Sequence, residues 1–102
     1  MQISVGARLR SAVDDTQVIV IRAPAEPIDV TCGGQPLLPI DAVAPSGGSI
    51  SAAHDGGTVL GKRYVDVRSG LELLCTKPGA GALFAEGRPL AIKAAKALPA
   101  SD

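Results

Sequence analysis

The two cysteines are the residues with the widest range of chemistry in this chain, and each lies beside a glycine-rich turn. Cys32 opens the turn over residues 31–37, and Cys75 comes directly before the turn over residues 78–81. Thiolates bind metals, form disulfides and act as nucleophiles, whereas buried thiols behave as small apolar side chains. The sequence therefore allows a metal centre, a redox pair or two structural thiols.

The surroundings of these turns resemble the knuckles of a zinc-ribbon or rubredoxin-like module, in which a Cys-x-x-Cys-Gly turn directs two thiolates at one metal. An apolar strand pattern precedes each turn, and a leucine follows it, Leu37 in the first and Leu83 in the second. Asp29 stands where the first turn would have its leading cysteine, and Pro78 where the second would have its trailing one. The resemblance implies a zinc site, because zinc accepts sulfur, nitrogen and carboxylate oxygen together. The candidate metal ligands are Cys32, Cys75, His54 and Asp29.

Two other interpretations of the cysteines stay open. In one, both are buried small apolar residues and His54 is a solvated loop residue. In the other, Cys32 and Cys75 form a disulfide or a thiol redox pair, which requires Cα atoms within about 7 Å of each other. Under all three interpretations we expect the two cysteines to lie close together.

No catalytic motif stands out. Residues 56–63 match the phosphate-loop spacing G-x-x-x-x-G-K, but Arg63 replaces the Ser or Thr that binds magnesium, and a strand pattern follows where a helix is required. A Cys75–His54 dyad lacks any local signature, and Asp14 and Asp15 are typical of a hairpin turn. We therefore predict no catalytic residues and a protein that is not an enzyme.

Length and charge limit the remaining classes. The chain has 102 residues, 46% of them hydrophobic, which fits one β-rich domain over residues 1–102. Ten acidic and ten basic residues are scattered without a run of like sign, which argues against nucleic acid as a partner. No stretch predicts a membrane span or a secretory signal, so we expect a cytoplasmic protein without a membrane partner.

Strand patterns dominate the elements that must position these residues. We predict a central hairpin with arms at residues 71–76 and 82–86, and a second hairpin whose return strand is residues 17–22. Residues 58–67 read as a strand with Val59, Leu60 and Tyr64 facing inwards, and residues 37–40 as an edge strand. Pro89 makes residues 88–96 ambiguous between helix and strand, and we favour the strand. The fold class predicted is all-β, a small antiparallel sheet or barrel-like domain built of hairpins.

Two segments lack such patterns. Residues 41–57 are rich in glycine, serine and alanine without any period, which predicts a long flexible loop. Residues 97–102 form an extended C-terminal end. Edge-type prolines and this end favour a small non-catalytic accessory or protein-interaction domain, part of a homo- or hetero-oligomer, without a cofactor. The alternatives are a zinc-binding ribbon-like protein using Cys32 and Cys75, and a thiol redox protein.

Overall fold

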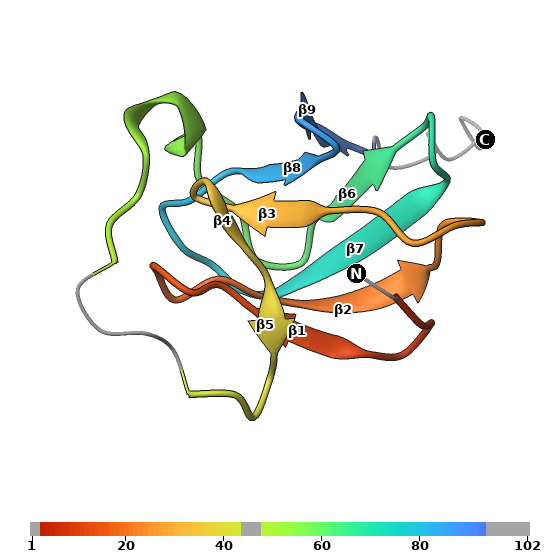
Figure 1. The fold of residues 1–102 in the computed structure, drawn as a ribbon, viewed down its shortest axis with the longest axis horizontal. Coiled ribbons are helices and arrows are strands. Elements are labelled where there is room, and N and C mark those ends of the chain that lie inside the picture. Colours follow the sequence, from red (N-terminus) through yellow and green to blue (C-terminus); the bar gives the residue numbers. More distant parts are fainter. Residues whose placement is uncertain (1–2, 44–47, 94–102) are drawn as a thin grey trace, which may run out of the picture.

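Two antiparallel sheets form the fold, which the computed structural model describes for residues 3–43 and 48–93 (Figure 1). The strands are β1 (Arg8–Arg10), β2 (Gln17–Arg22), β3 (Val30–Cys32), β4 (Gln35–Pro36), β5 (Leu38–Pro39), β6 (Arg63–Asp66), β7 (Leu71–Lys77), β8 (Leu83–Ala85), β9 (Arg88–Pro89) and β10 (Ala91–Ile92), with one short 3-10 helix, η1 (Ala52–His54). One sheet has the order β10-β6-β7-β2-β1-β5 and the other β4-β3-β8-β9. The all-β prediction is confirmed, and in the described ranges no α-helix occurs.

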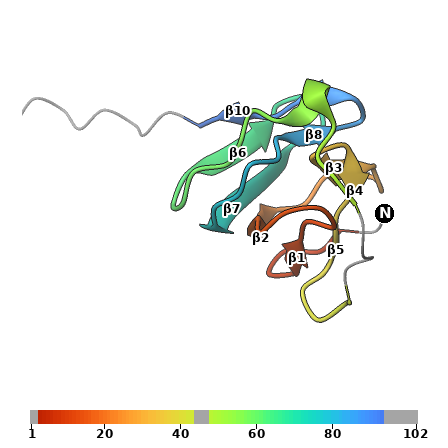
Figure 2. The same ribbon diagram turned by 90° about the vertical axis from the view of Figure 1, so that its left-hand side faces the viewer.

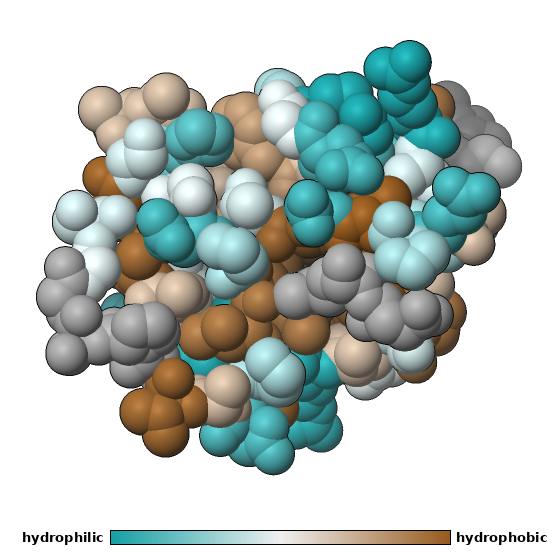
Figure 3. Space-filling view, viewed as in Figure 1, coloured by the Kyte–Doolittle hydropathy of each residue, from teal (hydrophilic) through white to brown (hydrophobic). Residues whose placement is uncertain are grey.

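The core lies between the two sheets, because β2, β3, β6 and β8 alternate buried residues with more exposed ones. Buried residues of β2, β6 and β7 from the larger sheet join those of β3 and β8 from the smaller one in a single cluster. Its members from these strands are Val18, Val20, Tyr64, Leu71, Leu73, Cys75, Val30, Cys32, Leu83 and Ala85. Figure 2 shows the two sheets side by side, with β10 at the outer edge of the larger one. Figure 3 shows apolar surface gathered between β3 and β5, where the two sheets meet.

Three short hairpins follow turn chemistry that the sequence indicated. The strands β1 and β2 pair antiparallel around the turn that contains Asp14, as predicted. Gly33 and Gly34, both with positive φ, join β3 to β4. Glu86 and Gly87, with φ of 49° and 76°, join β8 to β9 in the same way. Two consecutive residues with positive φ match the right-handed twist of the flanking strands, which is why glycine recurs at these turns.

The predicted central hairpin is wrong in its pairing, although both of its arms are strands. β7 pairs with β2 and β6, whereas β8 pairs with β3 and β9, so the turn over residues 78–81 carries the chain from one sheet to the other. The hairpin partner of β7 is β6, joined by the predicted turn around residues 68–70. A glycine-rich turn is compatible with a hairpin and with a crossover between sheets. Which of the two forms depends on the strands that each arm pairs with, and here those strands belong to different sheets.

The segment before β6 also differs from the prediction. Val59 and Leu60 are exposed, at 51% and 60%, whereas Tyr64 is buried as predicted. A turn at Gly61, with φ of 80°, delays the strand until Arg63, and the Val59 N–H donates to Tyr64 Oη at 2.9 Å. No helix follows this segment within the described chain, as the rejected phosphate-loop match would require.

The long loop and the C-terminal region agree with the prediction in part. η1 and several backbone hydrogen bonds interrupt the predicted loop over residues 41–57, so it is not one uniform irregular segment. Ser51 N donates to Gly33 O, and His54 O accepts from Ala82 N, which ties the loop to both glycine turns. The favoured strand assignment for residues 88–96 is confirmed by β9 and β10 as far as Ile92, and residues 94–96 lie outside the described residues. The predicted end at residues 97–102 lies outside the described residues.

Candidate interaction surface

The two cysteines are free thiols buried in the core, Cys32 on the smaller sheet and Cys75 on the larger. Both point into the space between the sheets, next to a buried pair of threonines. The hydroxyls of Thr16 and Thr58 lie 3.0 Å apart there. Cys75 Sγ donates to the carbonyl of Lys77 at 3.2 Å, and Cys32 Sγ donates to Asp14 Oδ1 at 3.8 Å.

Asp14 lies in the hairpin turn that the sequence predicted, and it also organises this buried polar cluster. Its carboxylate accepts hydrogen bonds from Thr16 Oγ1 at 2.9 Å, from Thr16 N at 3.3 Å and from Gly81 N. The Cys32 thiol donates to the same carboxylate at 3.8 Å. Ser11 Oγ accepts from the N–H groups of Val13 and Asp14, which shapes the turn that presents the carboxylate. Asp14 therefore fastens the first hairpin to the crossover between the sheets.

Gly79 and Gly81 allow this close approach. A Cβ at Gly79 would overlap Thr16 Oγ1 and lie 2.5 Å from Asp14 Oδ2. A Cβ at Gly81 would lie 3.0 Å from both Asp14 Oδ2 and Cys32 Sγ. Since Cβ atoms almost never come within 3.0 Å of another heavy atom, the glycines of this turn are required by packing against Asp14. The spacing Ser11-x-x-Asp14-x-Thr16 was the sequence signal for this arrangement.

The electrostatics of the cluster oppose thiol chemistry. Burial raises the pKa of the Cys32 thiol to about 11, and the neighbouring charge of Asp14 raises it as well. Burial also raises the pKa of Cys75. Nucleophiles and metal ligands need the thiolate, which these pKa values disfavour at neutral pH. Both residues have the environment of structural thiols.

The structure does not bring the four candidate metal ligands together. Asp29 precedes β3, and its carbonyl accepts from Glu86 N, so three residues of extended strand, roughly 10 Å, separate it from Cys32. His54 instead packs edge-on against Phe84, with ring centroids 4.2 Å apart. Across residues 3–43 and 48–93, no three His, Cys, Asp or Glu side chains form a group that could hold a metal ion.

The outer face of the six-stranded sheet carries a different arrangement of functional groups. The residues Arg8, Ile19, Leu74 and Arg63 are direct neighbours across β1, β2, β7 and β6. Directly paired residues of antiparallel strands project from the same face, and Leu73 and Cys75 on either side of Leu74 are buried. The row therefore consists of two half-buried aliphatic side chains flanked by two exposed arginines. Lys93, whose N–H donates to Arg63 O, extends the row beyond β10.

Positive charge dominates this face. Its cations are Arg8, Arg10, Arg22, Arg63 and Lys93. We call these five residues, together with Ile19 and Leu74 between them, the cationic face. Among the described residues that these strand pairings place there, the acidic side chain is Glu72. Half of the ten basic residues thus lie on one face of a chain with no formal net charge. Sequence reasoning missed this segregation because cations at alternate strand positions look scattered along the chain.

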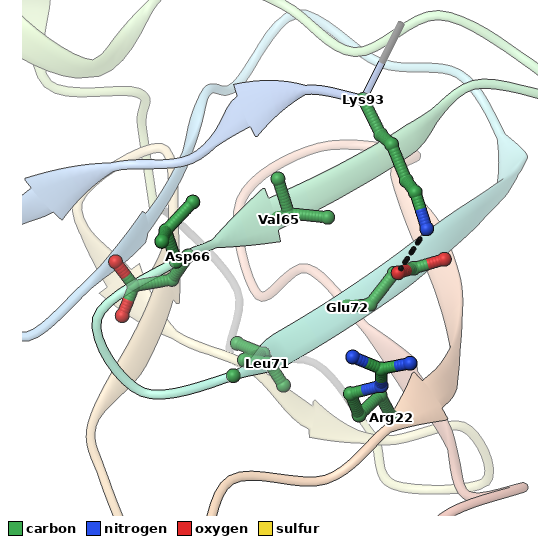
Figure 4. Close-up of a pocket in the computed structure, with 8 residues that line it drawn as sticks. Arg22, Val65, Asp66, Leu71, Glu72 and Lys93 are labelled. Atoms are coloured by element: carbon green, nitrogen blue, oxygen red, sulfur yellow. Dashed lines mark hydrogen bonds and ion pairs between the residues drawn. The ribbon is translucent and has the colours of Figure 1, made fainter. Parts of the chain in front are cut away.

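Glu72 holds the end of this face in place. Its carboxylate, 6% exposed, accepts from Lys93 Nζ at 3.1 Å and from Arg63 Nη1 at 3.4 Å. Figure 4 shows Lys93 reaching across β6 to this carboxylate, while Arg22 lies on its other side. Two cations pair with the single charge of Glu72, which satisfies the buried carboxylate and leaves positive charge in excess. Arg22, Glu72 and Lys93 line a groove of about 350 Å³ beside Val65.

A second carboxylate braces the opposite side of the same hairpin. Asp66 is buried, and Arg88 from β9 donates to it at 2.7 and 3.2 Å. The Ser69 hydroxyl donates to it as well, at 2.7 Å. The hydrogen bonds from Arg88 lower the pKa of Asp66 below its ordinary value. This ion pair joins the smaller sheet to the β6–β7 hairpin that carries Glu72.

No family model, curated protein or solved structure matches this chain. The described residues contain no helix with the length and apolarity needed to cross a membrane. The site must therefore be interpreted from its own geometry.

Proposed function

We propose that this protein is a non-catalytic interaction domain that binds an acidic protein segment over its cationic face. The observation that carries the proposal is the cross-strand row in which Arg8 and Arg63 flank Ile19 and Leu74. An exposed sheet face with aliphatic residues inside a cationic border fits a peptide that has both acidic and aliphatic side chains. The buried thiols, with raised pKa values, support a structural role for the core rather than a redox function.

The character of this face favours a protein partner over nucleic acid. Single-stranded nucleic acids bind by stacking their bases on aromatic side chains, in addition to phosphate contacts. The chain has two aromatic residues of the Phe, Tyr and Trp types. Tyr64 is buried, and Phe84 lies on β8 in the other sheet. The centre of the cationic face is aliphatic instead.

Charge also favours a different partner over a second copy through the same face. Two cationic faces brought together would oppose like charges, and Glu72 of each copy is already paired with Lys93 and Arg63. An acidic partner meets complementary charge without rearrangement of these ion pairs. The proposal is therefore for a hetero-complex.

Peptide titration followed by NMR tests the proposal. The probes are a peptide with alternating valine and glutamate, a peptide of the same composition with the glutamates in one block, and an oligothymidylate of equal charge. We expect both peptides to shift amide resonances of β2, β6 and β7, and to bind more tightly than the oligothymidylate. Tighter binding of the oligothymidylate, or no binding of either peptide, would overturn the proposal.

Charge reversal gives the matched control. The double variant Arg8→Glu with Arg63→Glu should weaken peptide binding at least tenfold, because both ends of the cationic row are inverted. Arg68→Glu reverses one charge in the β6–β7 turn, beside Pro24 and Glu26 in a different hollow, and should leave binding unchanged. Because the double variant reverses two charges, a loss of binding free energy in Arg68→Glu equal to half of the loss in the double variant would show that net charge, rather than this face, attracts the peptide.

A further inference from the structure

The edges of the two sheets differ in one respect, the presence of proline. The four edge strands are β5 and β10 in the larger sheet and β4 and β9 in the smaller. Proline stands in three of them, as Pro39 in β5, Pro36 in β4 and Pro89 in β9. β10 consists of Ala91 and Ile92 and has none. Proline on an edge strand blocks pairing with another chain, because it has no N–H to donate.

The register places each proline where its missing N–H would point away from the sheet. In an antiparallel pair, the backbone groups of alternate residues point to the partner strand and away from it. The residue after each proline donates inwards: Leu37 N to Val30 O, Ile40 N to Arg8 O and Leu90 N to Leu83 O. Each proline therefore occupies the outward position of its strand. All three closed edges use the same device.

Ile92 occupies the corresponding position on β10 and keeps its outward donor. Lys93 N donates to Arg63 O, so the N–H and C=O of Ile92 point to the open edge. The Ile92 side chain is 52% exposed. Lys93, the residue directly after β10, belongs to the opposite face of the sheet, where its ammonium group contacts Glu72. The edge of β10 thus combines a backbone donor and acceptor that no described residue pairs with, an apolar side chain on one face and a cation on the other.

We infer that β10 is the docking edge for an extended segment of an acidic partner, which adds to the larger sheet as a further strand. The inference rests on the proposed function and specifies the partner's chemistry. The partner residue paired with Ile92 would be apolar. The partner residues before and after it would project from the other face of the sheet, on the side of Lys93 and Arg63, and would be acidic. The recognised pattern is therefore an alternation of acidic and apolar residues, in which main-chain hydrogen bonds supply affinity and alternate side chains supply specificity.

A second copy fits this edge poorly. Pairing of β10 with β10 would place Lys93 of both chains on the same face of the joined sheet, continuing two cationic faces into one. The acidic side chain near that position, Glu72, already contacts Lys93 and Arg63 within its own chain. Charge complementarity thus selects a different, acidic chain.

Ile92→Pro tests the inference directly, because it introduces at β10 the residue that the other three edges carry. The outward N–H of Ile92 makes no hydrogen bond within the sheet, so the variant should keep the fold, as judged by its amide spectrum. Ile92→Val is the conservative control. We expect the alternating valine–glutamate peptide to bind wild type and Ile92→Val at least tenfold more tightly than Ile92→Pro. The block peptide should not distinguish the three proteins.

The backbone contribution is tested on the peptide side as well. Methylation of alternate peptide amides on the side that would face β10 should abolish the preference for the alternating peptide. Methylation of the other set should not. If Ile92→Pro unfolds the domain, this pair of peptides decides the question on wild-type protein.

The outcomes separate the inference from the proposed function. Loss of binding in the Arg8→Glu, Arg63→Glu variant, with no effect of Ile92→Pro or of amide methylation, would overturn strand addition and retain the cationic face as the interface. Failure of both peptides to bind would overturn both. Tight self-association of the wild type that Ile92→Pro abolishes would show that the edge serves a second copy, which also overturns the inference.

Discussion

Replacing Asp14 with alanine should destabilise the fold by about 3 kcal/mol, because its carboxylate ties the first hairpin to the crossover between the sheets. The carboxylate accepts hydrogen bonds from Thr16 Oγ1 at 2.9 Å, from Thr16 N at 3.3 Å and from Gly81 N. A hydrogen bond to a charged group contributes roughly 1.5–3 kcal/mol net. Asp14 is half-buried, so the lower end applies, and its two strongest bonds together give about 3 kcal/mol.

Urea unfolding followed by circular dichroism measures this effect. With a denaturant dependence of about 1.3 kcal/mol per molar, the midpoint should fall by about 2 M. Asp14→Asn keeps one acceptor oxygen and loses the charge, so its midpoint should lie between those of wild type and Asp14→Ala. Asp15→Ala is the matched control: Asp15 is exposed and makes no side-chain hydrogen bond to the described residues, so it should stay within about 0.5 kcal/mol of wild type.

Equal midpoints for Asp14→Ala and Asp15→Ala would refute the reasoning. In that case the bonds to Thr16 and Gly81 would contribute nothing beyond what water offers the same groups in the unfolded chain. Asp14 would then be an ordinary turn residue, as its sequence context alone indicates. A smaller but distinct loss, with Asp14→Asn equal to Asp14→Ala, would assign the effect to charge alone.

Three further predictions follow from the same packing. Gly79→Ala should destabilise the fold in urea unfolding because its Cβ would overlap Thr16, whereas Gly56→Ala, whose Cβ would lie 3.5 Å from the nearest atom, should have little effect. Leu73→Ala should destabilise it by roughly 2–5 kcal/mol, because Leu73 is fully buried in the core; a midpoint equal to that of wild type would contradict its core position. The pKa of Asp66 is lowered below 3.8 in the folded state, so the stability that Asp66 contributes should be complete above about pH 3.8 and lost as pH falls through the folded value. Asp66→Asn should flatten the acid side of a plot of urea midpoint against pH, and an unchanged slope would exclude this role.

Local turn chemistry made much of the fold predictable from sequence. The pair Gly33-Gly34 and the pair Glu86-Gly87 mark two-residue hairpins, since both positions need positive φ and few residues other than glycine tolerate it. Pro89 left a helix or a strand open for the residues after it, and the preceding Glu86-Gly87 turn fits the strand that the structure has. These signals are properties of two or three adjacent residues, which a sequence displays directly.

The partner of each strand could not be predicted in the same way. The turn over residues 78–81 looks like a hairpin turn in isolation, yet it crosses between sheets. The deciding contacts are with Asp14 and Thr16, more than sixty residues earlier in the chain. Because a glycine is required both at a tight turn and where a side chain approaches the backbone, residue type alone does not separate the two.

The candidate site was hidden for a related reason. Charge along the chain is balanced, and the prediction against nucleic acid relied on that balance. Strand alternation sends Arg8 and Arg10 to one face while Leu9 enters the core. Only the order of strands in the sheet shows that Arg63 joins them. The cysteines attracted attention by their type, but both are buried, and burial raises the pKa of each thiol.

The contact between Asp14 and Gly81 spans 67 positions of the chain, and this separation has a consequence for synthesis. The first hairpin, β1 and β2 with their turn, is synthesised early. The Gly81 N–H that donates to its Asp14 carboxylate leaves the ribosome much later. β1, β2 and β3 likewise take partners from β5, β7 and β8. A nascent chain therefore carries unpaired strand edges until residues beyond 85 have left the ribosome, which makes folding late and cooperative. Pro36 and Pro39, which close the edges of β4 and β5, are already present at that stage, and they hinder incomplete chains from pairing with one another at these edges.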